Sequence, residues 1–451
     1  MSDTIAAIST ALGVGAISII RVSGIDAIKI VNKIFVGKDL EQQESHTMYY
    51  GHIKNNEEII DEVLVSIMRA PKTFTKEDVI EINCHGGISS TNKILETLLT
   101  NGCRLAEPGE FTKRAFLNGR IDLVNAESIM NMINAENDSA RRVAMKGIDG
   151  YLSNKIKNIR QTLLELLASI EVNIDYPEYE DAIDMTINEV LPQIENIKKE
   201  IEILIEKSEN GKILTTGIKT AIVGRPNVGK SSILNKLLNE DKAIVTDIEG
   251  TTRDTVEGKI NLGGVTLNII DTAGIRKTDD VVEKIGVEKS LKLIDEATLI
   301  IVVLNSNEKL TEEDKLILEK TKDKHTIIVL NKSDLEQNIE LEQIREKNRI
   351  KTNTIDLEGL FELEEIIKKM FNLNELRSED YTYLSNARQI SLAKEALSSL
   401  NDAIDTCKEE LPVDMIEIDI KKCWEKLGEI IGESYSEELI DQLFTQFCLG
   451  K

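Results

Sequence analysis

The sequence is poor in cysteine and histidine, and each scarcity excludes a class of protein. Its 451 residues contain four histidines and five cysteines, at positions 84, 103, 407, 423 and 448. An odd number of scattered cysteines without a CxxC pair indicates reduced, intracellular thiols rather than a disulfide framework. The pair Cys84-His85 has no second pair at metal-ligand spacing, which argues against a zinc site.

Positive net charge and long apolar runs are missing as well. The formal net charge is −24, which argues against a broad basic face for nucleic acid, although a local basic patch stays open. No apolar run approaches ~18 residues, and the first residues lack the pattern of a signal peptide. We therefore expect a cytoplasmic protein without membrane association, and its composition, 41% hydrophobic and 30% charged, is that of an ordinary globular protein.

Length and periodicity predict a multidomain α/β protein of roughly three domains. Residues 1–118 mix strand-like runs, AISIIRVSG and DVIEINCHGG, with helical runs, which indicates an α+β domain. Residues 119–216 and 374–451 are mainly helical. Residues 217–373 alternate strands with helices, the pattern of a doubly wound, mostly parallel sheet. We interpret the helical segments as one helical domain that is split by an inserted domain.

A phosphate-binding loop, GRPNVGKS, spans 224–231 between the strand TAIV and the helix SILNKLL. In such a loop the glycines let backbone N–H groups turn toward phosphate oxygens, and the helix N-terminus adds partial positive charge. Lys230 would neutralise the outer phosphates, and Ser231 would ligate Mg²⁺. A chance glycine-rich turn is the alternative, and the strand–loop–helix context argues against it.

Three further motifs indicate that the nucleotide is GTP. They are TDIEGTTRD (246–254), DTAG (271–274) and NKSD (331–334). The first offers hydroxyls for a second Mg²⁺ ligand, Asp271 can hold the metal's water, and Gly274 can sense the γ-phosphate. The carboxylate of Asp334 can accept both the ring N–H and the exocyclic amine of guanine, a pair of donors that adenine lacks. The predicted GTP-binding residues are Asn227, Val228, Gly229, Lys230, Ser231, Ser232, Thr246, Asp247, Ile248, Glu249, Gly250, Thr251, Thr252, Asp271, Thr272, Ala273, Gly274, Asn331, Lys332 and Asp334.

The residue after DTAG is Ile275, where many regulatory GTPases have a glutamine that orients water. Hydrolysis therefore needs another group to position water and another positive charge. Asn227 offers a side-chain carbonyl suited to a monovalent cation. Glu283 offers a carboxylate, and the alternative is that it is one of many surface glutamates. The stretch 352–356 departs from the Ser-Ala-Lys-like loop usual beneath guanine, so we expect modest guanine affinity.

These motifs, with others at both ends of the chain, resemble the family of the tRNA modification GTPase MnmE, also called TrmE. The match covers essentially the whole chain. It includes RVSG (21–24), FTKEDVIEINCHGG (74–87), EPGEFTKRAFLNGRIDL (107–123), DTAGIR (271–276) and FCLGK (447–451). Family members commonly end in FCIGK, so Leu449 is a mild departure.

The resemblance implies a domain order and a chemistry. Residues 1–118 would form an N-terminal domain for tetrahydrofolate binding and dimerisation, and 217–373 an inserted P-loop GTPase domain. Residues 119–216 and 374–451 would form the split helical domain, the second part carrying FCLGK. A homodimer would join an FAD-dependent partner resembling MnmG in a heterotetramer. Together they would add an aminomethyl or carboxymethylaminomethyl group at C5 of the wobble uridine, position 34, of certain tRNAs. A 5,10-methylene- or 5-formyl-tetrahydrofolate would supply the one-carbon unit.

The resemblance also assigns site residues motif by motif. The folate ligands would be Arg21, Glu81, Arg120 and Lys451, although the third is often lysine. The K⁺ ligands would be Asn227, Thr246, Ile248 and Thr251, and the Mg²⁺ ligands Ser231 and Thr252. The catalytic residues would be Lys230, Glu283, which would help position water, and Cys448, near the one-carbon group. K⁺ would supply positive charge between the β- and γ-phosphates, as an arginine finger does elsewhere. From the residues alone, Glu81 could be a solvent-face charge and Arg21 a simple salt-bridge partner.

Two other functions compete with this interpretation. A ribosome-assembly GTPase acting as an RNA-binding switch would use a similar nucleotide site, but the acidic flanks supply no basic appendage. A lipid anchor on Cys448 is the second alternative, but Gly450 and Lys451 do not fit a prenylation signal. The segment before it, EIIGESYSEELIDQLFTQ, has five acidic residues and no basic one. Whether Cys448 does chemistry or only lines a site stays open.

Overall fold

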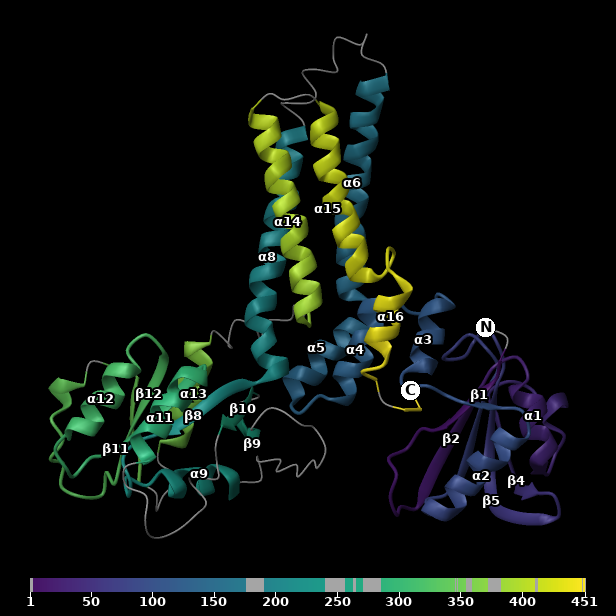
Figure 1. The fold of residues 1–451 in the computed structure, drawn as a ribbon, viewed down its shortest axis with the longest axis horizontal. Helices are drawn as coiled ribbons and strands as arrows, with labels where there is room; N and C mark the ends of the chain where they lie inside the picture. Colours follow the sequence, from purple (N-terminus) through teal and green to yellow (C-terminus); the bar gives the residue numbers. More distant parts are fainter. Residues whose placement is uncertain are drawn as a thin grey trace. The chain divides into compact units, whose positions relative to one another are not determined.

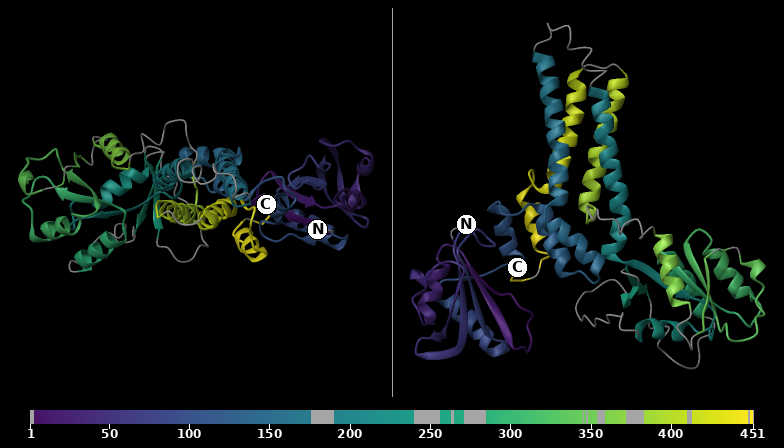
Figure 2. Two further views of the ribbon diagram at one scale, coloured as in Figure 1. Left: turned by 90° about the horizontal axis from the view of Figure 1, so that it is seen from above. Right: turned by 180° about the vertical axis from the view of Figure 1, so that it is seen from behind.

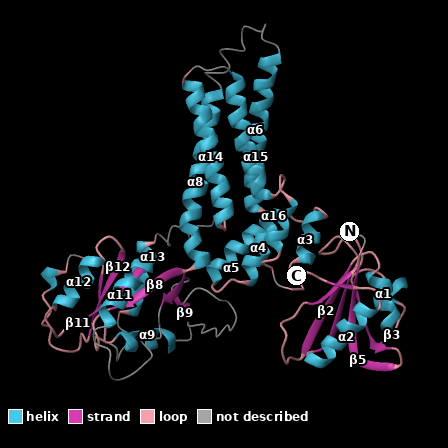
Figure 3. Ribbon diagram, viewed as in Figure 1, coloured by secondary structure: helices cyan, strands magenta, loops and turns pink. Residues whose placement is uncertain are grey.

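The structure, a computed structural model of the full chain (Figure 1), forms two compact units, each assembled from segments that are far apart in the sequence. It describes residues 3–175, 190–239, 256–262, 265–270, 285–344, 346, 348–353, 359–371, 383–409, 413–447 and 449–450. Unit 1 takes Met1–Met130, Ile148–Pro177 and Val413–Lys451, and unit 2 takes Asn131–Gly147 and Glu178–Pro412. The units cut across the predicted helical segments, so the four-part domain division stays a prediction. The mixed α/β composition is confirmed (Figure 3).

Unit 1 contains a seven-stranded sheet in the order β3-β4-β5-β6-β2-β1-β7. The strands are β1 (Ile5–Ile8), β2 (Ile17–Ser23), β3 (Phe35–Val36), β4 (Thr47–Asn55), β5 (Glu58–Met68), β6 (Val79–His85) and β7 (Arg104–Leu105). Neighbours are antiparallel except β1 and β7. Helices α1 (Ala27–Ile34) and α2 (Ile88–Thr100) pack on one face, where Ile20, Val22 and Ile82 enter the core. Because side chains alternate along a strand, Arg21 and Glu81 point to the other face.

The two strands predicted in this unit are β2 and β6, and the helical runs after them are α1 and α2. The hairpin β4–β5 was missed. Its turn lies at Asn56-Glu57, where Asn56 has a φ of 55°. Asparagine tolerates positive φ, and a polar turn between two runs of β-branched and aromatic residues was the signal that could have found the hairpin.

The helices of unit 1 include α3 (Glu110–Leu117), α4 (Leu123–Ile133), α6 (Tyr151–Asp175), α15 (Val413–Ile431) and α16 (Glu437–Phe444). Helix α15 packs along α6 (Figure 2). The Arg160 guanidinium lies 3.9 Å from the centroid of the Trp424 ring, and its Nε donates to the Trp424 carbonyl. A Cβ on Gly428 would come within 2.9 Å of Arg160 Nη2, so glycine makes room for the guanidinium. The single tryptophan therefore takes part in helix packing.

Unit 2 contains a six-stranded sheet in the order β13-β12-β11-β8-β10-β9. The strands are β8 (Ile218–Val223), β9 (Val256–Leu262), β10 (Val265–Ile270), β11 (Leu299–Asn305), β12 (His325–Asn331) and β13 (Arg349–Lys351). All neighbours are parallel except β9 and β10. Alternate residues of β8, β11 and β12 enter two cores. One core includes α9 (Lys230–Asn239) and α13 (Leu360–Met370), and the other includes α11 (Ile285–Glu296) and α12 (Glu312–Lys320). Both faces of this sheet are therefore covered, as expected for a mostly parallel sheet.

Three further helices belong to unit 2: α5 (Asp138–Ile148), α8 (Leu191–Thr216) and α14 (Ala387–Lys408). Helix α14 packs along α8. The buried Asn137 caps α5 through a bond from the Ala140 N–H, and its own amide donates to the Leu214 carbonyl and the Thr266 hydroxyl. The start of α5, the end of α8 and β10 are thereby joined. Among the described helices, none has the length and apolar character needed to cross a membrane.

Candidate functional site

The phosphate-binding loop follows β8, which lies between β10 and β11 in the middle of its sheet. In parallel sheets, ligands bind beyond the carboxyl ends of strands at the point where the strand order reverses. Gly224 has a φ of 150°, and a Cβ there would lie 2.4 Å from the Val303 carbonyl oxygen. Gly229 has a φ of 100°, and a Cβ there would lie 2.0 Å from Asn331 Nδ2. Only glycine therefore fits at both positions. Helix α9 begins at Lys230, so the loop ends at a helix N-terminus, which is suited to binding phosphate.

The Lys230 ammonium lies inside this loop. It donates to the carbonyl oxygens of Gly224, at 2.8 Å, and Arg225, at 2.6 Å. Burial lowers the pKa of Lys230 to about 8. Phosphate oxygens at this position would replace neutral carbonyl acceptors by charged ones and would raise that pKa again. The side chain is therefore placed for the phosphate contact that the motif predicts.

Arg225 fixes the loop to α12, a contact that the sequence interpretation missed. Its Nε donates to Asp314 Oδ1 at 3.0 Å, and its Nη2 donates to Glu308 Oε2 at 2.9 Å. Asp314 is 1% exposed and also accepts bonds from the backbone and the hydroxyl of Thr311, which caps α12. The capping pattern T-x-x-D marks the helix start in the sequence, but no sequence signal pairs it with Arg225.

The NKSD motif contacts the phosphate-binding loop directly. Asn331, the last residue of β12, donates from Nδ2 to the Val228 carbonyl at 2.7 Å. Its Oδ1 is buried and has no hydrogen-bond partner within the described part of the chain. A buried acceptor without a partner is costly, and a donor on a bound ligand would satisfy it. Lys332 has a φ of 60°, and the exposed carboxylate of Asp334 lies in the turn that follows. Two motifs a hundred residues apart thus meet at one edge of the sheet.

Most of the predicted switch residues lie outside the described residues. They are Thr246, Asp247, Ile248, Glu249, Gly250, Thr251, Thr252, Asp271, Thr272, Ala273, Gly274, Ile275 and Glu283. The complete Mg²⁺ and K⁺ ligand sets therefore stay predictions. Asn227 is described and has a φ of 63°, a conformation that asparagine tolerates better than most residues. Within the described ranges, no group of three or more His, Cys, Asp and Glu side chains is placed to hold a metal ion.

The predicted folate ligands Arg21 and Glu81 form an ion pair in unit 1. Strand register sets them directly opposite each other on β2 and β6. Arg21 donates to Glu81 Oε1 from Nε at 2.9 Å and from Nη2 at 2.8 Å. Arg21 therefore has the salt-bridge partner that was the alternative interpretation for it, and Glu81, for which the alternative was a solvent-face charge, is that partner. A ligand with N–H groups would have to share Glu81 with Arg21.

Gly450, one of the described residues near the end of the sequence, contacts this ion pair. Arg21 Nη1 contacts the Gly450 carbonyl at 3.4 Å, and the Ser9 hydroxyl donates to the same oxygen at 3.0 Å. Gly450 has a φ of 85°, and a Cβ there would lie 2.3 Å from the Ile8 carbonyl. The buried Phe444 and Phe447 anchor this segment by packing with residues of α3 and α4. Cys448 and Lys451, on either side of the described Leu449 and Gly450, lie outside the described residues.

Two aromatic rings connect Arg21 with the third predicted folate ligand, Arg120. The Arg21 guanidinium lies 5.7 Å from the centroid of the buried Phe111 ring, and that of Arg120 lies 4.8 Å from the Phe74 ring. Phe74 packs against the small core that contains Phe111. The structure thus links Arg21, Glu81 and Arg120 through residues that the sequence interpretation did not single out.

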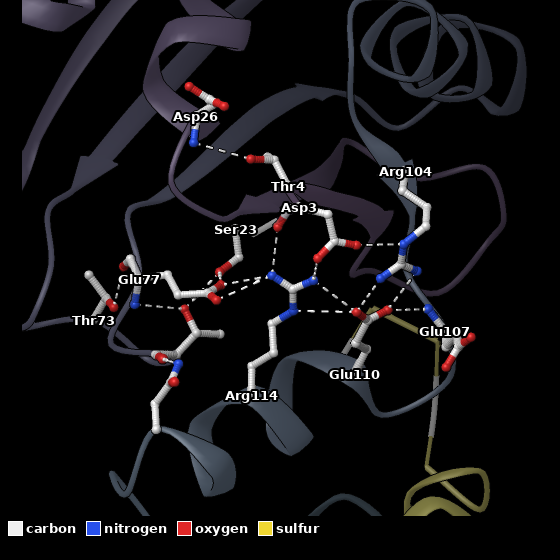
Figure 4. A network of polar contacts seen from close by, with 12 residues as sticks. Asp3, Thr4, Ser23, Asp26, Thr73, Glu77, Arg104, Glu107, Glu110 and Arg114 are labelled. Atoms are coloured by element: carbon white, nitrogen blue, oxygen red, sulfur yellow. Dashed lines mark hydrogen bonds and ion pairs between the residues drawn. The ribbon is translucent and has the colours of Figure 1, made fainter. Parts of the chain in front are cut away.

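An ionic network centred on the buried Arg114 lies in the same unit (Figure 4). The Arg114 guanidinium, 1% exposed, contacts the carboxylates of Asp3, Glu77 and Glu110. Arg104 also pairs with Asp3 and Glu110. Burial opposes the ionisation of Glu110, but hydrogen bonds from Arg104, the Glu107 backbone and Arg114 outweigh it and lower its pKa. The network holds α3, the loop before β6 and the residues before β1 together.

The four described cysteines are all buried. Burial raises the pKa of Cys103 and of Cys423 to about 12, and it also raises the pKa of Cys84 and Cys407. The thiolate is the reactive form of cysteine, so these four thiols are unsuited to nucleophilic chemistry at neutral pH.

Comparison with known proteins matches almost the whole chain. The family model for the GTP-binding protein TrmE N-terminus matches residues 4–120, and that for the MnmE helical domain matches residues 123–448. A tRNA modification GTPase MnmE of Lactococcus lactis subsp. cremoris (strain SK11) is 55% identical over 449 residues, which cover 100% of this chain and 98% of that protein. A tRNA modification GTPase MnmE of Staphylococcus haemolyticus is 53% identical over 456 residues, which cover 100% of this chain and 99% of that protein. With identity above half along its full length, the chain belongs to the MnmE (TrmE) family of tRNA modification GTPases.

Proposed function

We propose that the chain hydrolyses GTP and uses it in the modification of C5 of uridine 34 in certain tRNAs, together with an MnmG-like, FAD-dependent partner. The observation that carries the nucleotide part is the hydrogen bond from Asn331 to Val228. It brings the phosphate loop and the motif that contains Asp334 to one edge of one sheet. Phosphates would bind the loop and Lys230, and guanine would donate its ring N–H and exocyclic amine to Asp334.

The remaining roles in hydrolysis follow the family pattern. Ser231 with Thr252 would hold Mg²⁺, and Asn227 with Thr246, Ile248 and Thr251 would hold K⁺. K⁺ would add positive charge between the β- and γ-phosphates where the bond breaks, and Glu283 would position the attacking water. Asn331 Oδ1, which has no hydrogen-bond partner among the described residues, and the two positions that only glycine fits support a bound nucleotide.

For the tRNA reaction, we propose that unit 1 binds a one-carbon tetrahydrofolate. Arg21, Glu81, Arg120 and Lys451 would contact it, and Cys448 would lie near the one-carbon group. Folate carries N–H groups, an aromatic ring and carboxylates, and the described side chains offer a carboxylate, the partly buried Phe74 ring and guanidinium groups. We expect a homodimer of chains with the four-part domain division, assembled with the partner into a heterotetramer.

The modification role is tested by mass analysis of tRNA nucleosides from a deletion strain. We expect C5 modification of uridine 34 to be absent and to return with the wild-type gene; unchanged wobble uridines in the deletion strain would refute the role. A Cys448→Ser gene that keeps GTPase activity but does not restore modification would assign chemistry to the thiol. Cys84→Ser is the matched control, because its Sγ already donates to the Ser18 carbonyl and a hydroxyl can replace it.

The K⁺ role predicts that GTP turnover is at least tenfold faster in KCl than in NaCl, a barrier difference of about 1.4 kcal/mol. The Asn227→Ala variant should turn over GTP equally slowly in both salts, as measured by phosphate release. Because alanine is strained at a φ of 63°, Asn227→Gly is the control, since glycine adopts this φ freely. Loss of the salt effect in both variants supports a cation ligand, whereas loss in the alanine variant alone would indicate backbone strain.

A further inference from the structure

The turn that follows β11, residues 305–308 with the sequence NSNE, belongs to none of the nucleotide-binding motifs. We call it the β11 turn. Strands β11 and β12 are parallel neighbours, and their last residues, Asn305 and Asn331, are partners in the sheet. On its other side β11 pairs with β8, which leads into the phosphate-binding loop. The β11 turn therefore leaves the sheet between the NKSD motif and the phosphate-binding loop.

On one side of the β11 turn, the buried Ser306 supports the backbone of the NKSD motif. Its hydroxyl donates to the carbonyl oxygens of Asn331, at 2.8 Å, and Lys332, at 2.9 Å, so its single proton is shared between them. Its backbone N–H also donates to the Asn331 carbonyl, at 3.0 Å. Lys332 has a φ of 60°, which is unfavourable for lysine and persists only where the surroundings hold it. Ser306 thus stabilises the conformation that leads to Asp334, two residues further on.

On the other side of the β11 turn, Glu308 supports the phosphate-binding loop through Arg225. Glu308 Oε2 accepts a hydrogen bond from Arg225 Nη2 at 2.9 Å, and its Oε1 accepts one from Asn305 Nδ2 at 2.7 Å. The Nε of the same arginine donates to the buried Asp314 carboxylate. The Arg225 carbonyl is in turn one of the two acceptors of the Lys230 ammonium. Fixing the Arg225 side chain therefore fixes a backbone atom that contacts the phosphate-binding cation.

A bound nucleotide would contact both motifs at once, its base at NKSD and its phosphates at the loop. The spacing of the two motifs therefore has to match the ligand, and supporting hydrogen bonds are what hold binding groups to such precision. In the β11 turn these hydrogen bonds come from two residues that are almost adjacent, Ser306 and Glu308. Motifs that are held in place before binding lose less conformational entropy when the nucleotide arrives.

We propose that the β11 turn sets the spacing of the two motifs. Ser306 is the positioning residue for recognition of guanine, and Arg225, held by Glu308, is the positioning residue for the phosphates. This inference rests on the proposed nucleotide site, and it requires neither side chain to touch the nucleotide. The two roles are separable, because loss of the Ser306 hydroxyl should impair discrimination between bases, whereas loss of Arg225 should weaken phosphate binding whatever the base.

The test compares GDP with IDP, which lacks the exocyclic amine of guanine, by titration calorimetry of the full chain with Mg²⁺. We expect the wild-type protein to bind GDP about tenfold more tightly than IDP, as for one hydrogen bond to a charged acceptor. Ser306→Ala should lower this ratio to about threefold or less, with kcat at saturating GTP within about twofold of the wild-type value. Ser306→Cys, which nearly keeps the volume and offers only a weak S–H donor, should give an intermediate ratio.

The phosphate role is tested by Arg225→Gln, which removes the charge-assisted bonds to both carboxylates. We expect GDP and IDP to bind about tenfold more weakly, and their ratio to stay at the wild-type value. The matched control is Thr326→Val, at the other end of β12. It removes a buried hydroxyl that donates to the Thr321 carbonyl at 3.0 Å, and it should change neither the affinities nor the ratio.

Each role fails on a distinct result. An unchanged ratio in Ser306→Ala, with or without weaker binding, would refute the role in guanine recognition, and so would an equally lowered ratio in Thr326→Val. If Ser306→Ala does not fold, the ratio measured for Ser306→Cys decides the question. Unchanged affinities in Arg225→Gln would refute the role in phosphate binding. Binding of neither nucleotide by the wild-type protein would instead refute the nucleotide site itself.

Discussion

Replacing Asp334 by asparagine is expected to weaken GTP binding by about 10²–10³-fold, because two hydrogen bonds to a charged acceptor are lost at ~1.5–3 kcal/mol each, partly offset by solvation of the exposed site. The asparagine amide places a donor where guanine also has a donor. Xanthine has a carbonyl in place of the exocyclic amine, so the same variant should gain use of XTP. The measurement is KM and kcat for GTP and XTP with the full chain.

The Asp334 prediction separates base recognition from phosphate chemistry. The value of kcat at saturating XTP should approach that of the wild-type enzyme with GTP, since the phosphate loop and Lys230 are untouched. Asp323→Asn, an exposed carboxylate between α12 and β12, is the matched control and should leave KM for GTP unchanged. Tight GTP binding by Asp334→Asn would show that this carboxylate does not read guanine.

Replacing Arg114 by methionine is expected to destabilise unit 1 by about 3–5 kcal/mol, because the largely buried Glu77 loses its cationic partner and the buried Glu110 keeps only Arg104. Arg114 is 1% exposed and donates to both oxygens of Glu77 and to Glu110. Methionine fills much of the volume but supplies no donor. Calorimetry of the full chain, with hydrogen exchange of peptides from β1, β2 and α3, would locate the loss in this unit.

The Arg114 effect should depend on pH with a definite sign. The pKa of Glu110 is below its ordinary value of 4.5, so its ionic contacts stabilise the fold above about pH 4.5 and lose that effect as pH falls through the lowered value. The difference between the wild-type protein and Arg114→Met should therefore be largest near pH 7 and shrink below pH 4.5. Arg141→Met, which removes an exposed ion pair with Asp138, should cost far less than Arg114→Met. A similar loss in both variants would contradict the role of burial.

The nucleotide site could be predicted from sequence motifs because each of its parts is a short local stretch. GRPNVGKS carries its strand, loop and helix in one short stretch, and the structure has β8 and α9 on either side of it. Residues 331–334 likewise follow a continuous apolar run that forms β12. The glycines of this loop could be interpreted from the sequence alone, because positive φ and close contacts exclude other residues at these positions.

Contacts between distant segments could not be predicted in the same way. Arg225 with Asp314, Arg21 with the Gly450 carbonyl, and Phe74 with Phe111 join segments that share no pattern. The spacing of Arg114 and Glu110, four residues apart on one helix, predicts their ion pair from the sequence. The contacts of Arg114 with Asp3 and Glu77 form only when the sheet is assembled. The hairpin β4–β5 was missed although its asparagine turn was available.

The sequence by itself determined the α/β character, the phosphate loop and the preference for a guanine nucleotide, because each depends on residues close together in the chain. It also determined the family, which depends on identity along the whole length. The tertiary structure decided which charges are neutralised. It pairs Arg21 with Glu81 and buries Arg114 among three carboxylates. Ion pairing depends on distances of a few ångströms between side chains, and strand register and helix packing set those distances only in the folded chain.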